Sequence, residues 1–338
     1  MSTLLPPKPG AATATAPAPA RATLRGPVRV LLRMHRKALW AGAALLVLGI
    51  GVVVALRVWM ASSKVLCSDG DITTCGDDIY VPSYAHTSAE GFLVNGGTVL
   101  VLLAALIGVF VAGPLIAREL ESGTFRPAWA QSVSPAHWLA ARLAVPAALT
   151  VTGLTVLVVV LRWGLWALRA GPDTPGLRWH ANGVFPGTGP AILGYALLAV
   201  AVGALCAVIV RRTLLSMSLT ALVLGAVAAC LGTWRYELWP SSFRKSTEAM
   251  GYDAGDWPIE SGMLTASGEK LYWQDCYEAD MAQGVEACMR GRGGIGYFSE
   301  YHPASHYWPL QLVETGILLA LAALAVFAAF RVLRRLHG

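Results

Sequence analysis

Two carboxylates lie close together in a short charged stretch between two long apolar runs. Glu119 and Glu121 belong to this stretch, which also contains Arg118 and Arg126 and has helix-forming character. Carboxylates beside arginines form ion pairs within a chain or with another protein. The membrane topology derived below makes them the only acidic residues on the inner face, which favours presentation of the stretch to a soluble partner. The alternative is that they only balance the neighbouring arginines.

A third acidic residue, Glu314, lies about one turn inside an apolar run near the end of the chain. Gln311 precedes it by three residues and falls on the same helical face. A charge in hydrocarbon costs on the order of 3 kcal/mol even on insertion scales, so Glu314 is expected to face protein or water. Two interpretations are open: an ion pair near the outer surface with Arg57 or Arg235, or a place with Gln311 in a pathway across the membrane or its outer gate.

The histidines and glycines do not predict catalysis, a metal site or a nucleotide site. His302 and His306 have the i, i+4 spacing of two metal ligands on a helix, but Pro303 lies between them and no glutamate completes a metalloprotease pattern. The glycines of 291–296 lack the strand and helix that cradle a phosphate. We therefore expect interfacial packing for the histidines and no cofactor in this chain, so that any ATP must bind to another protein.

Four of the six cysteines fall in stretches that are predicted to lie outside the membrane. They allow three pairings, and closeness in sequence favours Cys67–Cys75 and Cys276–Cys288. Each bridge is worth about 2.5–3 kcal/mol by loop-closure arithmetic. Free or metal-binding thiols are the alternative.

Six long apolar runs of the sequence are expected to form the helices that hold these residues in place. The 338 residues are 55% hydrophobic and 14% charged, well below the charge of roughly 25% in a soluble domain. A helix needs about 20 apolar residues to cross a bilayer, and the runs that qualify are 39–58, 92–116, 138–161, 190–210, 214–231 and 310–330. The sequence predicts an all-α membrane protein with six transmembrane helices. Gly113 and Pro114 predict a kink in the second run, and Arg211 and Arg212 a tight turn between the fourth and fifth.

The distribution of charge predicts the orientation. With the N-terminus inside, the inner segments hold 15 of the 26 Lys and Arg residues but two of the 20 Asp and Glu residues. Lys and Arg accumulate on the cytoplasmic side of membrane proteins, so both termini are expected in the cytoplasm. The pI near 9.1 therefore indicates membrane topology and not nucleic-acid binding.

The chain divides into parts along this topology. Residues 1–20 are rich in Pro and Ala and predict a disordered cytoplasmic tail. Residues 21–37 place arginines on one helical face and predict an interfacial amphipathic helix on membrane lipid, unless they are simply the positive flank of an anchor. Transmembrane helices 1–5, with a cytoplasmic segment at 117–137, fill 38–234. A disulfide-stapled extracellular cap is expected at 235–307, and the sixth transmembrane helix with a cytoplasmic C-terminus at 308–338.

Residues 113–143 read GPLIARELESGTFRPAWAQSVSPAHWLAARL. This segment resembles the connection after the second helix of bacterial ABC exporter permeases of the type-2 class, although Ser134, Pro135 and His137 depart from a pattern that often has basic residues there. Residues 301–317 (YHPASHYWPLQLVETGI) resemble the start of the last helix of that group. The resemblance implies a coupling surface for an ATPase made by Arg118, Glu119, Glu121, Gly123, Thr124, Arg126, Trp129 and Gln131.

The resemblance also implies two permease copies, as a homodimer, above two ABC ATPase subunits that hold ATP and Mg. The chain is then no enzyme by itself. It would be the permease subunit of an exporter that moves a hydrophobic or amphipathic compound, such as a drug, an antibiotic or a peptide, out through the bacterial cell membrane. Ionisable residues near the bilayer midplane, which a proton-coupled carrier needs, are missing from the six runs. A membrane-embedded ligand-binding, immunity or sensor protein without transport is the alternative.

Overall fold

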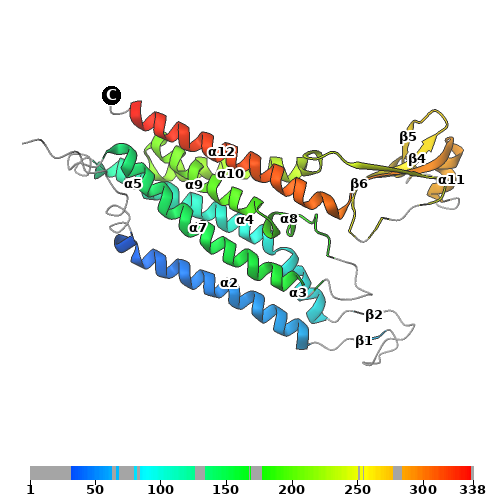
Figure 1. The fold of residues 1–338 in the computed structure, drawn as a ribbon, viewed down its shortest axis with the longest axis horizontal. Helices are drawn as coiled ribbons and strands as arrows, with labels where there is room; N and C mark the ends of the chain where they lie inside the picture. The colour runs from blue at the N-terminus through cyan, green and yellow to red at the C-terminus, as the bar shows by residue number, and fades with distance from the viewer. Residues whose placement is uncertain are drawn as a thin grey trace, which may run out of the picture.

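The computed structural model describes residues 32–62, 66–67, 80–81, 84–125, 134–166, 168, 177–249, 252–253, 255–276 and 284–335. Six helical segments of this part are long and apolar enough to cross a membrane, which confirms the predicted number. They are α2 (Arg36–Ser62), the joined α3 to α5 (Thr87–Ser122), α7 (Pro135–Trp166), α9 (Ala191–Val210), α10 (Thr213–Trp234) and α12 (Tyr307–Arg335). Figure 1 shows them packed as an elongated bundle.

The N-terminal predictions fall mostly outside the described residues. Residues 32–34 are helical and a turn at His35 separates them from α2, but the tail and the rest of the proposed interfacial helix are not described. After α2, the short strands β1 (Leu66–Cys67) and β2 (Tyr80–Val81) pair antiparallel.

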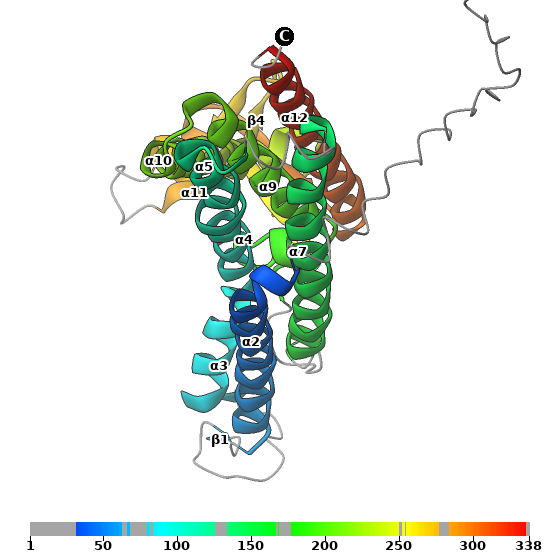
Figure 2. The same ribbon diagram turned by 90° about the vertical axis from the view of Figure 1, so that its left-hand side faces the viewer.

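Helix α9 is the central helix of the bundle, as Figure 2 shows. It contacts α12, α10, α5, α4 and α7, and most of its residues are buried, whereas the most apolar window of α2 has no buried residue. Its sequence is rich in Ala, Gly and Val, and small side chains let neighbouring helices approach closely. At one such point a Cβ atom on Gly203 would lie 2.6 Å from the carbonyl oxygen of Gly108. Glycine is therefore required at this crossing.

The second span consists of four consecutive helical parts. Helices α3 (Tyr84–Val94) and α4 (Gly96–Ile107) are followed by a π-helical turn, η1 (Gly108–Ala112), and then by α5 (Gly113–Ser122). Pro114 lies in the first turn of α5, and a proline cannot donate the backbone hydrogen bond of a regular helix. The sequence predicts a kink at Gly113 and Pro114, and at this point the structure shows a wider π-helical turn directly before Gly113.

The turn between α9 and α10 is as short as predicted. Helix α9 ends at Val210 and α10 begins at Thr213. Arg211 adopts a left-handed conformation with φ 54°, and its amide donates to the carbonyl oxygen of Ala207. The two helices therefore form a tight antiparallel hairpin.

Residues 242–302 form a small module, called the sheet module below, at one end of the bundle (Figure 1). Its strands are β3 (Ser242–Ser246), β4 (Trp257–Thr265), β5 (Lys270–Tyr272) and β6 (Gly294–His302). They pair antiparallel in the order β3-β6-β4-β5. Helix α11 (Val285–Gly291) completes the module, and Met263, Cys276, Met289 and Tyr297 form its core. The predicted helical class holds for the bundle, but the sheet in the module was not predicted.

Candidate functional site

Residues 117–125 and 134–137 of the predicted coupling segment are described, and the first of these ranges belongs mostly to helix α5. Helix α5 lies at the end of the bundle opposite the sheet module (Figure 1). Ile116 and Ala117 are fully buried, and α5 contacts α9, α10 and α7. Arg118 is exposed on the other side of the helix. Gly123 ends α5 in a left-handed conformation with φ 72°, which glycine adopts at little cost. The helix therefore has one face fixed in the bundle and one face open.

Glu119 points back into the bundle. Its Oε2 atom accepts a hydrogen bond of 3.0 Å from Nε1 of Trp138 and forms an ion pair with Arg142. The Arg142 guanidinium also lies 4.3 Å from the centre of the Trp138 ring. The side chains of Arg142 and Glu119 are 14% and 22% exposed. Since Trp138 and Arg142 belong to the first turns of α7, this cluster fixes α5 to α7.

Glu121 has a different intramolecular partner. Its Oε2 atom accepts hydrogen bonds from the backbone amide and the hydroxyl of Thr213, at 3.0 and 2.7 Å. Thr213 is the first residue of α10, and a carboxylate there satisfies a free amide and interacts favourably with the helix dipole. Glu121 therefore caps α10, and the side chain is still exposed to solvent.

The structure thus gives the two carboxylates partners within the chain that the sequence analysis missed. The expected neighbours were Arg118 and Arg126, whereas the observed partners come from α7 and α10. Arg142 follows Trp138 by one helical turn in the printed sequence, and this pairing of a cation with an aromatic ring was the available signal. Thr124 bonds Ser122, with 2.9 Å between the two hydroxyl oxygens. Three other predicted residues lie outside the described residues: Arg126, Trp129 and Gln131.

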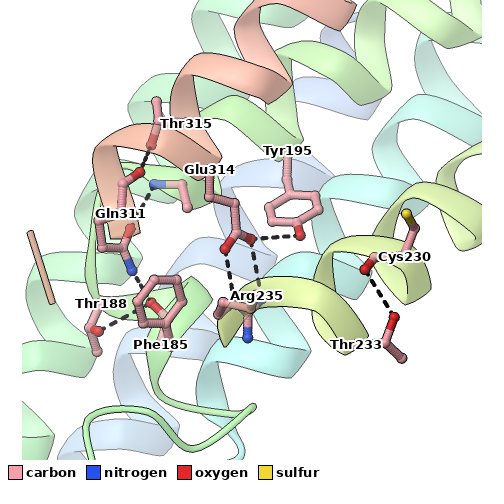
Figure 3. Close-up of polar contacts among 10 residues, drawn as sticks. Phe185, Thr188, Tyr195, Cys230, Thr233, Arg235, Gln311, Glu314 and Thr315 are labelled. Carbon is pink, nitrogen blue, oxygen red and sulfur yellow. Dashed lines mark hydrogen bonds and ion pairs between the residues drawn. The ribbon is translucent and has the colours of Figure 1, made fainter. Parts of the chain in front are cut away.

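Glu314 is fully buried near the sheet end of α12 and pairs with Arg235 (Figure 3). Nε and Nη2 of Arg235 lie 2.8 and 3.2 Å from the two carboxylate oxygens, and the Tyr195 hydroxyl donates to Oε1 at 2.8 Å. The Arg235 guanidinium also lies 4.6 Å from the centre of the Phe185 ring. Of the two predicted partners, Arg235 is correct. Arg57 lies instead over the ring of Trp163, at 4.2 Å.

Gln311 extends this buried network by one turn of α12. Its Oε1 atom accepts a hydrogen bond of 3.1 Å from the amide of Ala191, and its Nε2 atom donates to the carbonyl oxygen of Phe185. These contacts satisfy backbone groups in α8 (Phe185–Thr188) and at the start of α9. The network therefore joins α8, α9, α12 and Arg235, the residue directly after α10, at the sheet end. A role in a pathway or gate stays a prediction.

The cysteine predictions have different outcomes. Cys276 and Cys288 form a disulfide with 6.0 Å between their Cα atoms, as predicted. Cys75 lies outside the described residues, so the pairing of Cys67 with Cys75 stays a prediction. Of the described cysteines, Cys206 and Cys230 are free thiols.

His302 and His306, just before α12, contact each other. The Nδ1 atoms of His302 and His306 are 2.9 Å apart, and Nε2 of His302 lies 2.8 Å from the carbonyl oxygen of Tyr236. That carbonyl can only accept, so His302 donates from Nε2 and accepts at Nδ1 from His306. Within the described residues, no three His, Cys, Asp or Glu side chains are grouped to hold a metal ion.

Six membrane-spanning helices, an amphipathic helix fixed at one end and a folded module at the other define a multi-pass membrane protein. Comparison with family models identifies the class further. The family described as "ABC-2 membrane transporter related" matches residues 37–235, which is more than half of the chain, so the chain belongs to this family. It is thus a membrane component of the ABC transporter permease type and is not itself catalytic. Comparisons with curated proteins and with solved structures found no match.

Proposed function

We propose that this chain is the permease subunit of an ATP-driven exporter and that α5 transmits the work of a separate ATPase to the bundle. The observation that carries the proposal is the arrangement of α5: buried against α9 on one side and exposed at Arg118, Ser122 and Thr124 on the other. A helix placed in this way receives a force from a soluble partner at its open face. Its buried face passes that force to the transmembrane helices.

Two contacts would pass a movement of α5 on to α7 and α10. Glu119 ties α5 to Trp138 and Arg142 of α7, and Glu121 ties it to the first residue of α10. A displacement of α5 therefore moves the adjacent ends of both helices. The acids act as positioning residues in this proposal, and Arg118 with the 122–124 turn supplies the surface for the ATPase. ATP and Mg would be held by that partner.

The charge pattern supports an orientation with both termini in the cytoplasm. The end of the bundle that carries α5 also carries Arg211, Arg212 and the last turn of α12 with Arg334 and Arg335. Positive residues favour the cytoplasmic side of the bacterial cell membrane. The sheet module then lies outside the cell, where an oxidising compartment permits the Cys276–Cys288 disulfide. A homodimer of this chain would form the pathway for a hydrophobic or amphipathic compound.

Purification from its native membrane tests the proposal. We expect an ABC ATPase to copurify with the chain and its ATP hydrolysis to rise when the two are reconstituted. Arg118→Glu should weaken this association at least tenfold, because Arg118 is exposed and reversal places a like charge against an acidic partner surface. Arg334→Glu is the matched control, since it makes the same change at the same end of the bundle but outside α5.

If no ATPase copurifies, or if the two variants lose the association equally, α5 is not the coupling element. Copurification with a sensor kinase instead would favour the alternative of a ligand-binding or sensor protein.

A further inference from the structure

A cavity of about 740 Å³ lies at the sheet end of the bundle, where α7 ends and α12 begins. Its walls are formed by residues from the last turns of α7, from 177–188, from the start of α12 and by Gly255 of the sheet module. Its volume falls within the range of roughly 300–1,000 Å³ that is typical of small-molecule sites. The cavity has no lining residue from α5 and none from the Glu314–Arg235 pair. It is therefore distinct from α5 and shares no charged residue with the Glu314–Arg235 pair, although Thr188 of the adjoining α8 lines it.

Aromatic side chains dominate the walls. The lining rings are Trp163, Trp166, Trp179, Tyr307 and Trp308. Buried Leu165 and Val184 form an apolar floor together with Trp179, whereas the other three tryptophans are 44–66% exposed and form the rim. A ligand that enters therefore passes from half-exposed indole rings to a fully apolar floor, an arrangement that suits a compound with an apolar body.

Among the described residues that line the cavity, Arg162 is the only charged one and none is acidic. Its Nη1 atom donates a hydrogen bond of 2.7 Å to the carbonyl oxygen of Thr188, which fixes the guanidinium at the cavity wall. A guanidinium has five donor hydrogens in a planar fork. In the described part of the chain, this bond to Thr188 is the one interaction of that side chain. The remaining donors are suited to a carboxylate, sulfonate or phosphate oxygen.

A hydrogen bond and several ring contacts hold Trp179 in the cavity wall. Trp179 is 6% exposed, and its Nε1 atom donates to the carbonyl oxygen of Gly255 at 2.6 Å. Its ring meets the rings of Trp257 and Tyr307 edge to face, with centroids 5.7 and 5.9 Å apart. Bundle and sheet module thus meet in a fixed aromatic wall. A preformed wall reduces the ordering cost of binding.

We infer that this cavity binds a small amphiphilic anion, with its anionic group at Arg162 and its apolar body between the tryptophans. The volume of about 740 Å³ suits an occupant with one chain or a ring system. The site lies beside the ends of the membrane-spanning helices, where an amphiphile concentrates. Binding here requires neither ATP nor a partner chain, so this inference does not rest on the proposed transport function.

Photolabelling of the purified full-length chain in nanodiscs tests the inference. The probes are a medium-chain fatty acid with a diazirine, a trimethylammonium compound with the same chain, and a phosphatidylglycerol with the same diazirine. Peptide mass spectrometry maps the label. We expect the fatty acid to label the peptides that contain Trp163, Trp179 and Trp308, and the ammonium compound to label them at least tenfold less.

Variants identify the role of the guanidinium. Arg162→Gln should reduce labelling by the fatty acid about tenfold, and Arg162→Lys should retain most of it because the charge is kept. Arg292→Gln is the matched control, since Arg292 is an exposed arginine of the sheet module that does not line the cavity. The thermal unfolding temperature of each variant shows whether it is folded. Equal labelling by anion and cation, labelling by the phospholipid alone, or unchanged labelling of folded Arg162→Gln would each overturn the inference.

Discussion

Glu119 illustrates how a single residue can carry a different role from the one its position in the sequence indicates. Two acids in a charged stretch between membrane spans indicate a docking surface, and reversal of both would then leave folding intact. The structure pairs Glu119 with Arg142 and Trp138, so its reversal disturbs the bundle itself. The exposed face of α5 is therefore better tested at Arg118 than at the two acids.

We predict that Glu119→Lys lowers the free energy of unfolding by about 2–4 kcal/mol, because it leaves a mostly buried Arg142 beside a like charge. The double variant Glu119→Lys with Arg142→Glu should recover at least half of the loss. Thermal unfolding in detergent measures both. Glu121→Lys provides the comparison, since the Glu121 side chain is exposed to solvent and its substitution should lower the stability less than Glu119→Lys does. Equal losses for both glutamates would show that the α5–α7 cluster is not stabilising.

The Glu314–Arg235 pair gives a second prediction at this scale. Removal of one partner leaves an unpaired buried charge, so Glu314→Ala should cost about 3–5 kcal/mol. Glu314→Ala combined with Arg235→Met should cost clearly less than Glu314→Ala alone. A double-mutant cycle on thermal unfolding gives the interaction energy. Strictly additive losses would contradict a direct pair.

At the scale of elements, the sequence predicted the helices well and the sheet module poorly. Apolar runs identify membrane helices because the lipid requires long apolar segments with internal hydrogen bonds, and the cost of a buried charge made Arg235 a predictable partner for Glu314. The pairs that join α5 to α7 and α10 involve residues 23 and 92 positions apart, which no local pattern specifies. Strand β4 carries Pro258 and Gly262, which weaken the alternation that would have indicated a strand.

The disulfide gives a prediction for the sheet module as an element. Cys276 and Cys288 close a loop with a sequence separation of 12, so Cys276→Ser with Cys288→Ser should destabilise the module by about 3 kcal/mol. Limited proteolysis should then cut the module, while the six helices still insert and are protected. If the double variant increases the cleavage rate of the bundle helices as much as that of the module, the module and the bundle unfold together.

His180 gives a pH prediction for the contact between the bundle and the sheet module. Its ring is stacked on Trp257 of β4, with centroids 5.3 Å apart. Burial, with a smaller contribution from Arg178, lowers the pKa of His180 to about 4 from its ordinary value of 6.5. A lowered pKa in the folded state means that stability is present above pH 6.5 and is lost as the pH falls towards 4.

The unfolding temperature should therefore fall across this pH window in the wild type. The fall should be smaller in His180→Phe, which retains a stacked ring but does not titrate. An identical pH dependence of the two proteins would contradict the assignment to His180.

At the scale of the whole molecule, the two ends of the bundle differ in chemistry. One end carries α5, the Arg211–Arg212 turn and the basic end of α12, and the other carries the sheet module, its disulfide and the aromatic cavity. The buried face of α5 and its contacts with α7 and α10 connect the first end to the central helix α9. Under the proposed function, a cytoplasmic ATPase binds at the first end and the second end faces the outside of the cell.

Sided labelling of two single cysteines tests this account most directly. Thr124→Cys, next to α5, and Ser267→Cys, in the sheet module, are exposed positions. Each would be made in a background without Cys67, Cys75, Cys206 and Cys230, which leaves the disulfide of Cys276 and Cys288 in place. An impermeant maleimide should label position 267 but not 124 in intact cells. In inverted vesicles it should label position 124, and the bound ATPase should protect that position. Labelling of position 124 from outside, or its full reactivity with the ATPase bound, would contradict the account.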